Sequence, residues 1–246
     1  MNFQDLLKQM QRQGKLLGVF VLSFLIVAAH LSIGIDRTFA RAANTMEYPT
    51  PSTTPAITNT NKLQFNKKQI ALLKIAYKYG SEIGYPETIQ AILLQESNAG
   101  TANIIGDLNE AVGRRSYGRM QIKVATVRLI LPWYPDISKQ YFNGRGATSI
   151  LDEEIIALLL SNDDANIQIA ARIFEFKLKE SNNNWAKAVA AYNLGLAGAQ
   201  RIRHYSKFPY VAAVSGSISG VINPLNEQLG LAAHTSTAEI KVATTK

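Results

Sequence analysis

Apolar residues recur at helical spacing from residue 66 onward in this chain of 246 residues. Ile70, Leu73 and Tyr77 mark one face of a first helix, and Asn66 is of a residue type that favours the N-cap. Pro86 suits the first turn of a second helix, because the N–H that proline lacks has no helical partner there. The pattern predicts two consecutive amphipathic helices at the start of a folded domain.

The apolar face of the second helix ends in a carboxylate. Ile89, Ile92 and Leu93 lie at positions i, i+3 and i+4, and Glu96 follows at i+7. Desolvation on that face and the negative end of the helix dipole both raise the pKa of a carboxyl group. A carboxyl that stays protonated near neutral pH is what a general acid requires. Periodicity alone favours the simpler interpretation, an exposed glutamate at a frayed helix end.

Four more helices are expected between residues 120 and 200, and no run of alternating polar and apolar residues predicts a strand. The first of them runs from Ala125 to Leu129 and stops before Pro132, and the second opens with a capping box of Ser149 and Asp152. The third is capped by Asp163 or Asp164, and the fourth runs from Trp185 to Asn193 and ends at Gly195. The third of these helices should turn Ile167, Ala171, Phe174 and Leu178 inward. The sequence therefore predicts an all-α domain over residues 66–215, followed by a flexible tail over residues 216–246.

The N-terminal segment, residues 1–43, has the pattern of an export device. A nearly continuous apolar stretch, Leu16 to Ile35, follows three basic residues and one acidic residue, which orients the N-terminus toward the cytoplasm. Ala40-Arg41-Ala42 offers a cleavage site for a signal peptidase, whereas the 20-residue stretch also suffices as an apolar helix that spans a bilayer. A cleaved signal peptide and a retained membrane anchor both stay open. Residues 44–65, rich in Thr, Pro and Asn, predict a disordered linker.

Composition narrows the classes of partner and chemistry. The net charge of +8 favours an acidic partner, and peptidoglycan is one because its stem peptides carry carboxylates. The basic residues are scattered rather than clustered in runs, which disfavours nucleic-acid binding. The chain has no Cys, which excludes a disulfide framework, a thiolate metal site and a cysteine nucleophile. His30, His204 and His234 are dispersed, so neither a metal site nor any other cofactor is expected.

An ordered set of motifs changes the interpretation of Glu96. Gln95-Glu96-Ser97-Asn98 is followed by Ser116-Tyr117-Gly118-Arg119-Met120-Gln121-Ile122, and later by Ala190-Ala191-Tyr192-Asn193-Leu194-Gly195. Asp163-Asp164-Ala165-Asn166-Ile167 and Phe208-Pro209-Tyr210-Val211 add two further segments. The set resembles the lytic transglycosylases of the goose-type lysozyme-like superfamily over residues 70 to 215. This resemblance implies a lysozyme-like helical domain with a catalytic groove.

The same resemblance implies roles for individual residues. Glu96 would be the single catalytic acid/base, and Tyr192 would place its hydroxyl near it. Met120 has ordinary core packing as an equal alternative, and Tyr210 is expected to be core or groove wall. The substrate-binding residues would be Ser97, Ser116, Gly118, Met120, Gln121 and Asn193. Ser97 would orient Glu96 or the adjacent backbone, and Ser116 would be a second serine contact. Gly118 would admit the sugar, Met120 and Gln121 would line the groove, and Asn193 would brace the turn after Tyr192.

Two features depart from the family pattern. Arg119 replaces an apolar residue, and it either points into the groove, where it would pair with a stem-peptide carboxylate, or outward into solvent. The loop from Ala99 to Arg115 is longer than usual and contains Asp107 and Glu110. It leaves open which serine makes the second substrate contact.

The reaction implied by the resemblance is cleavage of the β-1,4 bond between N-acetylmuramic acid and N-acetylglucosamine, with formation of 1,6-anhydro ends. A hydrolase with two carboxylates needs a second acid, and none belongs to the motif set, because Asp163 and Asp164 are expected to be helix caps. A goose-type lysozyme hydrolase and a non-catalytic peptidoglycan-binding protein are the alternatives. The N-terminal segment predicts a protein of the periplasm or cell envelope that contacts the inner membrane. By analogy with the family, the partner would be a secretion, conjugation or phage machine.

Overall fold

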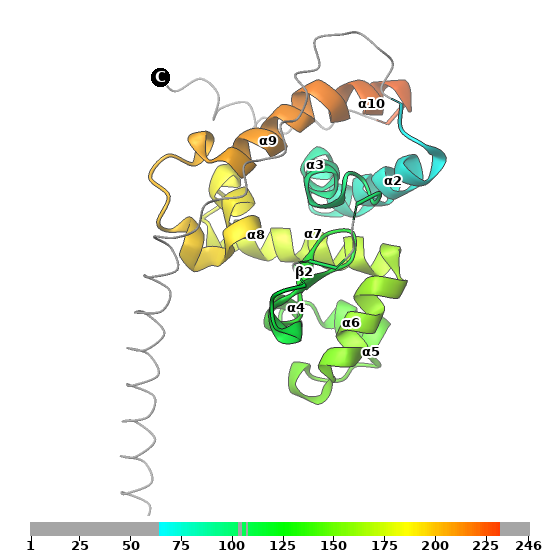
Figure 1. Cartoon of the computed structure of the whole chain (residues 1–246), viewed down its shortest axis with the longest axis vertical. Coiled ribbons are helices and arrows are strands. Elements are labelled where there is room, and N and C mark those ends of the chain that lie inside the picture. Colours follow the sequence, from blue (N-terminus) through cyan, green and yellow to red (C-terminus); the bar gives the residue numbers. More distant parts are fainter. Residues whose placement is uncertain (1–63, 103–104, 107, 232–246) are drawn as a thin grey trace, which may run out of the picture. The chain divides into compact units, whose positions relative to one another are not determined.

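The computed structural model describes residues 64–102, 105–106 and 108–231, all within the unit Ile57–Lys246. Over these residues the chain is built of helices joined by loops (Figure 1). The helices are α2 (Lys67–Glu82), α3 (Pro86–Ser97), α4 (Val124–Ile130), α5 (Pro135–Phe142), α6 (Asp152–Ser161), α7 (Asp163–Glu180), α8 (Trp185–Ala199), α9 (Pro209–Ser217) and α10 (Asn223–Gln228), with a π-helical turn at Ile218–Ile222. The predicted all-α class is confirmed.

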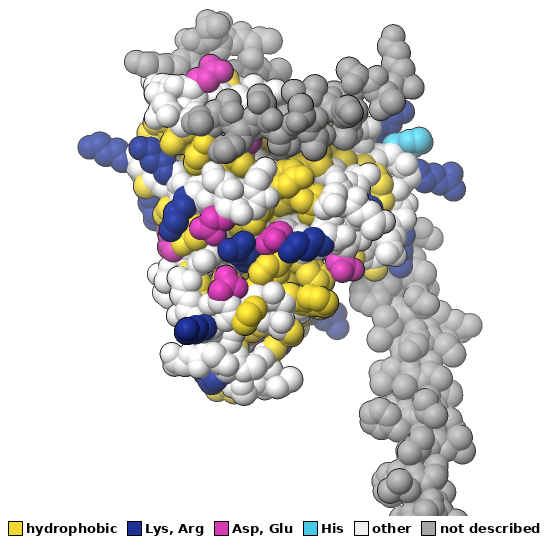
Figure 2. Space-filling view, turned by 180° about the vertical axis from the view of Figure 1, so that it is seen from behind, with side chains coloured by type: hydrophobic (Ala, Val, Ile, Leu, Met, Phe, Trp, Pro, Cys, Tyr) yellow, Lys and Arg dark blue, Asp and Glu magenta, His cyan; other side chains and the backbone are white. Residues whose placement is uncertain are grey.

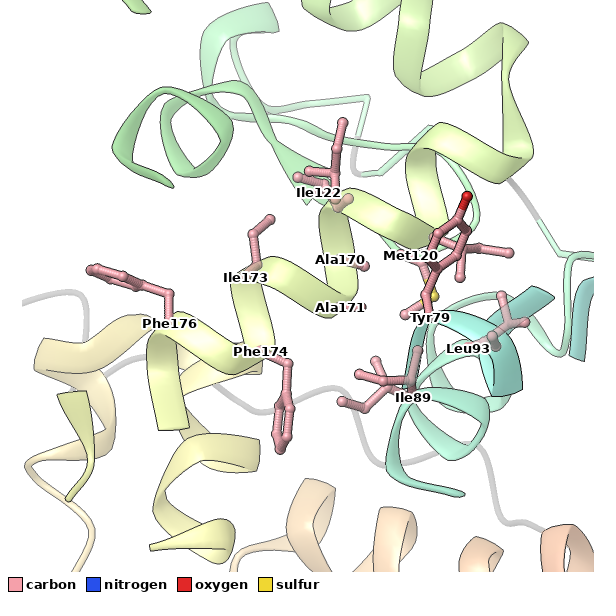
Figure 3. Close-up of a cluster of buried hydrophobic side chains, with 14 of the residues drawn as sticks. Tyr79, Ile89, Leu93, Met120, Ile122, Ala170, Ala171, Ile173, Phe174 and Phe176 are labelled. Carbon is pink, nitrogen blue, oxygen red and sulfur yellow. The ribbon is translucent and has the colours of Figure 1, made fainter. Parts of the chain in front are cut away.

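Helix α7 is the centre of this arrangement. It contacts α2 and α3, α4 and α6, and also α8, and in Figure 1 it runs between the α2–α3 pair and the group formed by α4, α5 and α6. The four residues expected to face inward, Ile167, Ala171, Phe174 and Leu178, are all buried. Ile173 and Phe174 leave α7 on opposite sides (Figure 3), so one helix supplies core residues to both of its neighbours.

The starts of α2 and α3 follow the sequence prediction. The side chain of Asn66 accepts a hydrogen bond from the backbone N–H of Gln69, whose side chain accepts one from Asn66 in return. This reciprocal capping box satisfies two of the N–H groups that a helix start leaves unpaired. Pro86 occupies the first turn of α3. Gly195 interrupts α8 with a φ of 77°, which confirms the predicted stop.

The predicted caps of α6 and α7 were wrong by one or two residues. The N-cap residue of α6 is Leu151, and its N–H donates to the carboxylate of Glu154. Ser149 does not cap the helix, because its hydroxyl donates to the carbonyl of Gly146. The N-cap of α7 is Asn162, whose side chain accepts from Ala165 N–H. Asp163 and Asp164 lie inside the first turn and bind partners elsewhere in the fold. At α7 the sequence offers several possible capping residues close together, and Asn162 is the one whose side chain caps the helix, whereas the N-cap residue of α6, Leu151, makes no side-chain cap hydrogen bond.

A short hairpin and a short helix were not expected from the sequence. Strands β1 (Ser116–Tyr117) and β2 (Ile122–Lys123) form an antiparallel hairpin in which Ser116 lies opposite Lys123. Strands of two residues are too short to show any alternation of polar and apolar positions. Helix α5, which begins at Pro135, also escaped prediction.

The predicted flexible tail over residues 216–246 begins too early. The chain stays helical to Gln228, and Ile222 and Leu225 are buried in the core. Asn226 exchanges two hydrogen bonds with the buried side chain of Gln90 on α3, at 2.8 and 3.0 Å. Polar residues between Ile218, Ile222 and Leu225 concealed an apolar stripe at helical spacing. Residues 232–246 lie outside the described residues.

The predicted export segment, residues 1–43, also lies outside the described residues, as does all but the end of the predicted linker at 44–65. Within the described part of the chain, no helix is both long enough and apolar enough to cross a membrane. The two outcomes proposed for the N-terminus therefore stay predictions.

Charges of both signs are interspersed on the surface of the domain. On the face shown in Figure 2, Lys and Arg side chains lie beside Asp and Glu side chains rather than in a separate stripe. Arg172 on α7 is an example, because it reaches Glu82 at 3.1 Å and Glu175 at 3.3 Å. This surface lacks the continuous basic band that a nucleic-acid backbone would require on that face.

Candidate active site

A pocket of about 290 Å³ lies where α3, the β1–β2 hairpin, α4, α7 and α8 meet. Glu96, from the last turn of α3, is the only acidic side chain among the described residues that line it. A larger hollow of about 470 Å³, between the start of α2 and α10, has no ionisable side chain in its described lining. The smaller pocket is therefore the place where acid–base chemistry is available.

The environment of Glu96 gives its carboxyl group an unusual pKa. Ile89, Ile92 and Leu93, which precede it on the same helix, are fully buried, and Glu96 itself is half-buried. Burial raises the pKa of Glu96 to about 7, and a hydrogen bond from Tyr210 partly opposes that rise. A carboxyl with this pKa exists in both protonation states near neutral pH, so it can donate a proton and then accept one.

Tyr210 is the residue that holds the Glu96 carboxylate. It lies in the first turn of α9, and its hydroxyl donates to Oε1 of Glu96 at 2.5 Å. Burial and the adjacent carboxylate raise the pKa of Tyr210 well above its usual range, so the hydroxyl keeps its proton and stays a donor. The sequence had placed Tyr210 in the core or the groove wall. The signal that pointed to more was its position in the Phe208-Pro209-Tyr210-Val211 segment.

Tyr192 lies in the pocket lining with Glu96 but has a different hydrogen-bond partner. Its hydroxyl donates to the carbonyl of Met120 at 2.9 Å and so ties α8 to the turn between β1 and β2. Burial, together with the negative charge of Glu96, raises the pKa of Tyr192. Tyr192 therefore lies in the same pocket as Glu96, as expected, while the hydrogen bond to the carboxylate comes from Tyr210.

The turn between β1 and β2 is fastened to α7 by Asn166. This fully buried side chain accepts from the N–H of Met120 at 2.8 Å and donates to the carbonyl of Tyr117 at 3.3 Å. Gly118, with a φ of 79°, passes so close to α6 and α7 that a Cβ would lie 2.4 Å from the carbonyl oxygen of Leu159 on α6 and 2.1 Å from Nδ2 of Asn166 on α7. The close approach that the structure shows at Gly118 is therefore to α6 and α7, and the expected approach to a sugar stays a prediction.

Two further residues with predicted substrate contacts are buried instead. Ser97 is 1% exposed, and its hydroxyl accepts from the N–H of Gly100 at 2.9 Å and donates to the carbonyl of Leu93 at 3.3 Å. It therefore holds the backbone turn after α3, which was one of its two expected roles. The side chain of Met120 is 0% exposed and fills the core, so its predicted place in the groove lining was wrong and the core alternative holds.

Ser116 and Gln121 are the predicted binding residues that do line the pocket. The hydroxyl of Ser116 donates to Oε1 of Gln121 at 3.0 Å, and the amide of Gln121 donates to the carbonyl of Gly118 at 3.0 Å. Asn193 also lines the pocket, but its exposed side chain makes no hydrogen bond to the described residues. The bracing role predicted for Asn193 is thus not seen.

Arg119 takes neither of its two expected orientations. Its guanidinium pairs with Asp163 at 3.0 Å and donates to the carbonyl of Gly100 at 2.8 Å, and the side chain is only 14% exposed. It ties the loop after α3 to the start of α7. Asp163 is held by this ion pair and is absent from the described lining of the pocket, so it does not serve as a second acid there.

The sequence did not single out the basic and apolar residues that complete the pocket. Thr126 on α4, Ile173 and Lys177 on α7, and Lys123 on β2 all lie in its lining. The one available signal was the spacing of Ile173 and Lys177, which puts both on one face of α7. Among the described residues no group of His, Asp and Glu side chains has the arrangement of a metal site.

A mostly helical domain with one partly buried carboxyl in its pocket is consistent with the lysozyme-like domain that the resemblance implies. Residues 157–210 match the family model described as Transglycosylase SLT domain, which confirms the resemblance seen in the sequence and supports the lytic transglycosylase family. The matched stretch contains Tyr192, Asn193 and Tyr210 but not Glu96. The comparisons with curated proteins and with solved structures found no match.

The contact between Tyr210 and Glu96 predicts a shift in the pH dependence of cleavage. The hydrogen bond stabilises the ionised carboxylate and lowers the pKa of Glu96, so Tyr210→Phe should raise that pKa. If protonated Glu96 is the acid, the descending limb of kcat/KM against pH should move about 1 unit to higher pH. Tyr192→Phe is the matched control and should leave the limb in place, because that hydroxyl donates to Met120. A shift in the control alone would show that the wrong tyrosine has been assigned.

Proposed function

We propose that this protein is a peptidoglycan lytic transglycosylase, which cleaves the bond between N-acetylmuramic acid and N-acetylglucosamine and leaves a 1,6-anhydro end. The observation that carries the proposal is the pocket with Glu96 as its only acidic side chain among the described lining residues, with a pKa raised to about 7. A reaction with a single carboxyl group fits this pocket better than one that needs two.

In the proposed reaction Glu96 acts twice. Its protonated carboxyl gives a proton to the glycosidic oxygen as the bond to C1 of muramic acid breaks. The resulting carboxylate then takes the proton of the C6 hydroxyl on the same sugar, and that oxygen bonds to C1. No water is consumed, because the nucleophile belongs to the substrate and is held at high effective concentration. Tyr210 keeps the carboxylate oriented through both steps by its hydrogen bond to Oε1.

The acids that could serve a two-carboxylate hydrolase have other partners in the structure. Asp163 pairs with Arg119, and Asp164 accepts a hydrogen bond from Tyr79 at 2.6 Å. Glu110, in the long loop after α3, lies 3.9 Å from Lys123 and is not part of the pocket lining. Asp107 lies outside the described residues. These contacts favour the transglycosylase over the goose-type hydrolase.

We further propose that the protein acts in the periplasm or cell envelope. The support is the apolar stretch Leu16 to Ile35 behind a basic N-terminus, which is typical of a signal peptide or of an anchor in the inner membrane. An anchored enzyme with a linker at residues 44–65 would open the wall locally, as an envelope-spanning secretion, conjugation or phage machine requires. This last step is an analogy with the family.

Product analysis tests the proposed reaction. Isolated sacculi digested with the full chain should release muropeptides that end in 1,6-anhydro-muramic acid, and each should be lighter by one water than the hydrolytic product in a mass spectrum. Reducing ends instead would identify a goose-type hydrolase. Binding to sacculi without any release of fragments would identify a non-catalytic peptidoglycan-binding protein.

A further inference from the structure

Lys177 is a buried cation that faces the same pocket as Glu96. It lies on α7 one turn after Ile173, and both residues line the pocket. The residue is only 6% exposed, and within the described residues its ammonium group has neither a hydrogen bond nor a carboxylate within 4 Å. Burial lowers the pKa of Lys177 to about 8, which still leaves it largely protonated at neutral pH.

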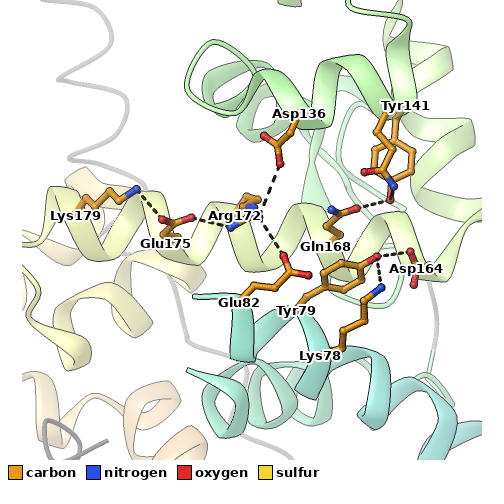
Figure 4. Close-up of polar contacts among 11 residues, drawn as sticks. Lys78, Tyr79, Glu82, Asp136, Tyr141, Asp164, Gln168, Arg172, Glu175 and Lys179 are labelled. Atoms are coloured by element: carbon orange, nitrogen blue, oxygen red, sulfur yellow. Dashed lines mark hydrogen bonds and ion pairs between the residues drawn. The ribbon is translucent and has the colours of Figure 1, made fainter. Parts of the chain in front are cut away.

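Its neighbours on α7 show how charges on this helix are otherwise arranged. Glu175 pairs with Arg172 and with Lys179, and Arg172 also reaches Glu82 and Asp136 (Figure 4). These charges are partly exposed and mutually compensated. Lys177 is the exception: a charge that costs free energy to bury and has no compensating partner within the described part of the fold.

Nothing in the site itself accounts for this cation. The pKa of Glu96 is set by burial and by Tyr210, so Lys177 is not needed to tune that carboxyl. Lys123, the other basic residue of the lining, is half-exposed and lies 3.9 Å from Glu110. An unpaired ammonium in a binding pocket is suited to an anionic group on the ligand.

We propose that Lys177 binds a carboxylate carried by the muramic acid side of the glycan strand, and that it makes the enzyme prefer strands bearing that carboxylate over neutral ones. The inference rests on the proposed function, because peptidoglycan is the substrate considered. N-acetylglucosamine is uncharged, so the anion comes from one of two sources. It is the lactyl carboxylate of muramic acid in strands without peptide, or a stem-peptide carboxylate in strands that keep it.

The test is a binding comparison with Lys177→Met in the full chain. Methionine keeps the length and apolar contacts of the lysine stem but removes the charge, so the variant should fold at least as stably as the parent. Both chains carry Glu96→Gln so that nothing is cleaved. Three probes are used: peptide-bearing glycan strands, strands stripped of peptide, and a chito-oligosaccharide of equal length, which has no carboxylate.

Lys177→Met should weaken binding of carboxylate-bearing strands by about 10-fold or more and leave chito-oligosaccharide binding unchanged. A loss confined to peptide-bearing strands identifies the stem peptide as the source, and a loss confined to stripped strands identifies the lactyl group. Lys179→Met, on the same helix but exposed and paired with Glu175, is the control and should change none of the affinities. An equal loss on all three probes, or no loss on any, overturns the proposal.

The result for Lys177 can be distinguished from the result for the proposed transglycosylase reaction. Product analysis of the unmodified chain decides whether the glycosidic bond is cleaved and how. The binding comparison decides whether Lys177 binds a carboxylate of the glycan strand, and it does so even for a protein that binds peptidoglycan without cleaving it. A selective loss of affinity with no anhydro product would keep the inference and reject the transglycosylase.

Discussion

Glu96→Gln is expected to reduce the release of muropeptides from sacculi by at least about 10²-fold, because a positioned general acid contributes roughly 10²- to 10⁴-fold to a rate. Glutamine matches glutamate in shape and can still accept the hydrogen bond from Tyr210, but it cannot donate a proton to the glycosidic oxygen. The measurement is the initial rate of release, with anhydro products counted by mass spectrometry. Glu153→Gln, at an exposed position in the first turn of α6, is the matched control and should leave the rate unchanged.

The same substitution should stabilise the fold at alkaline pH. The pKa of Glu96 is about 7 in the folded chain and near 4.5 when the carboxyl is solvated, so ionisation disfavours the folded state as pH rises through that interval. Glu96→Gln should therefore equal the parent in free energy of unfolding below pH 4.5. Above pH 7 it should exceed the parent by up to about 3 kcal/mol.

Denaturant unfolding at pH 4 and at pH 8 measures this difference. Low activity combined with higher stability above pH 7 is the signature of a catalytic carboxyl held in an apolar setting. Equal stability of parent and variant at both pH values would contradict the raised pKa of Glu96. Full activity of the variant would remove Glu96 from the reaction.

Gly118→Ala is expected to have the largest effect on stability, about 3 kcal/mol or more of lost unfolding free energy. A Cβ at this position would lie 2.4 Å from the carbonyl oxygen of Leu159 and 2.1 Å from Nδ2 of Asn166. Neither atom can retreat easily, because the first is backbone and the second is held by its hydrogen bond to Tyr117. Overpacking costs about 1–3 kcal/mol, and a positive φ adds about 1–2 kcal/mol for a residue with a Cβ.

Gly84 provides the control that separates these two contributions. It has the same φ of 79°, but a Cβ there would meet nothing within 4 Å. Gly84→Ala should therefore cost only the conformational part, about 1–2 kcal/mol. Denaturant midpoints of both variants measure the difference, which is the cost of pushing the hairpin away from Leu159 on α6 and Asn166 on α7. Equal losses for the two variants would show that the contact with Asn166 and Leu159 has no energetic weight.

The sequence determined the local features of this protein. Periodicity and capping signals act over three or four residues, so the starts of α2 and α3, the inward face of α7 and the break at Gly195 were all predictable. The position of Glu96 at the end of an apolar helix face was local too, but a raised pKa became the favoured interpretation only together with the motifs around Gly118 and Tyr192. The two-residue strands β1 and β2 escaped because they are too short to display a period.

Only the tertiary structure decided which groups meet in the pocket. Tyr210 reaches Glu96 across 114 positions of sequence, and Arg119 reaches Asp163 across 44. Neither pairing has a signal in local spacing, because it depends on how α9 packs on α3 and how the hairpin packs on α7. The burial of Lys177 was decided in the same way. The position of the acid on its helix is thus a local property of the sequence, whereas packing determined which hydroxyl holds it and which cation shares its pocket.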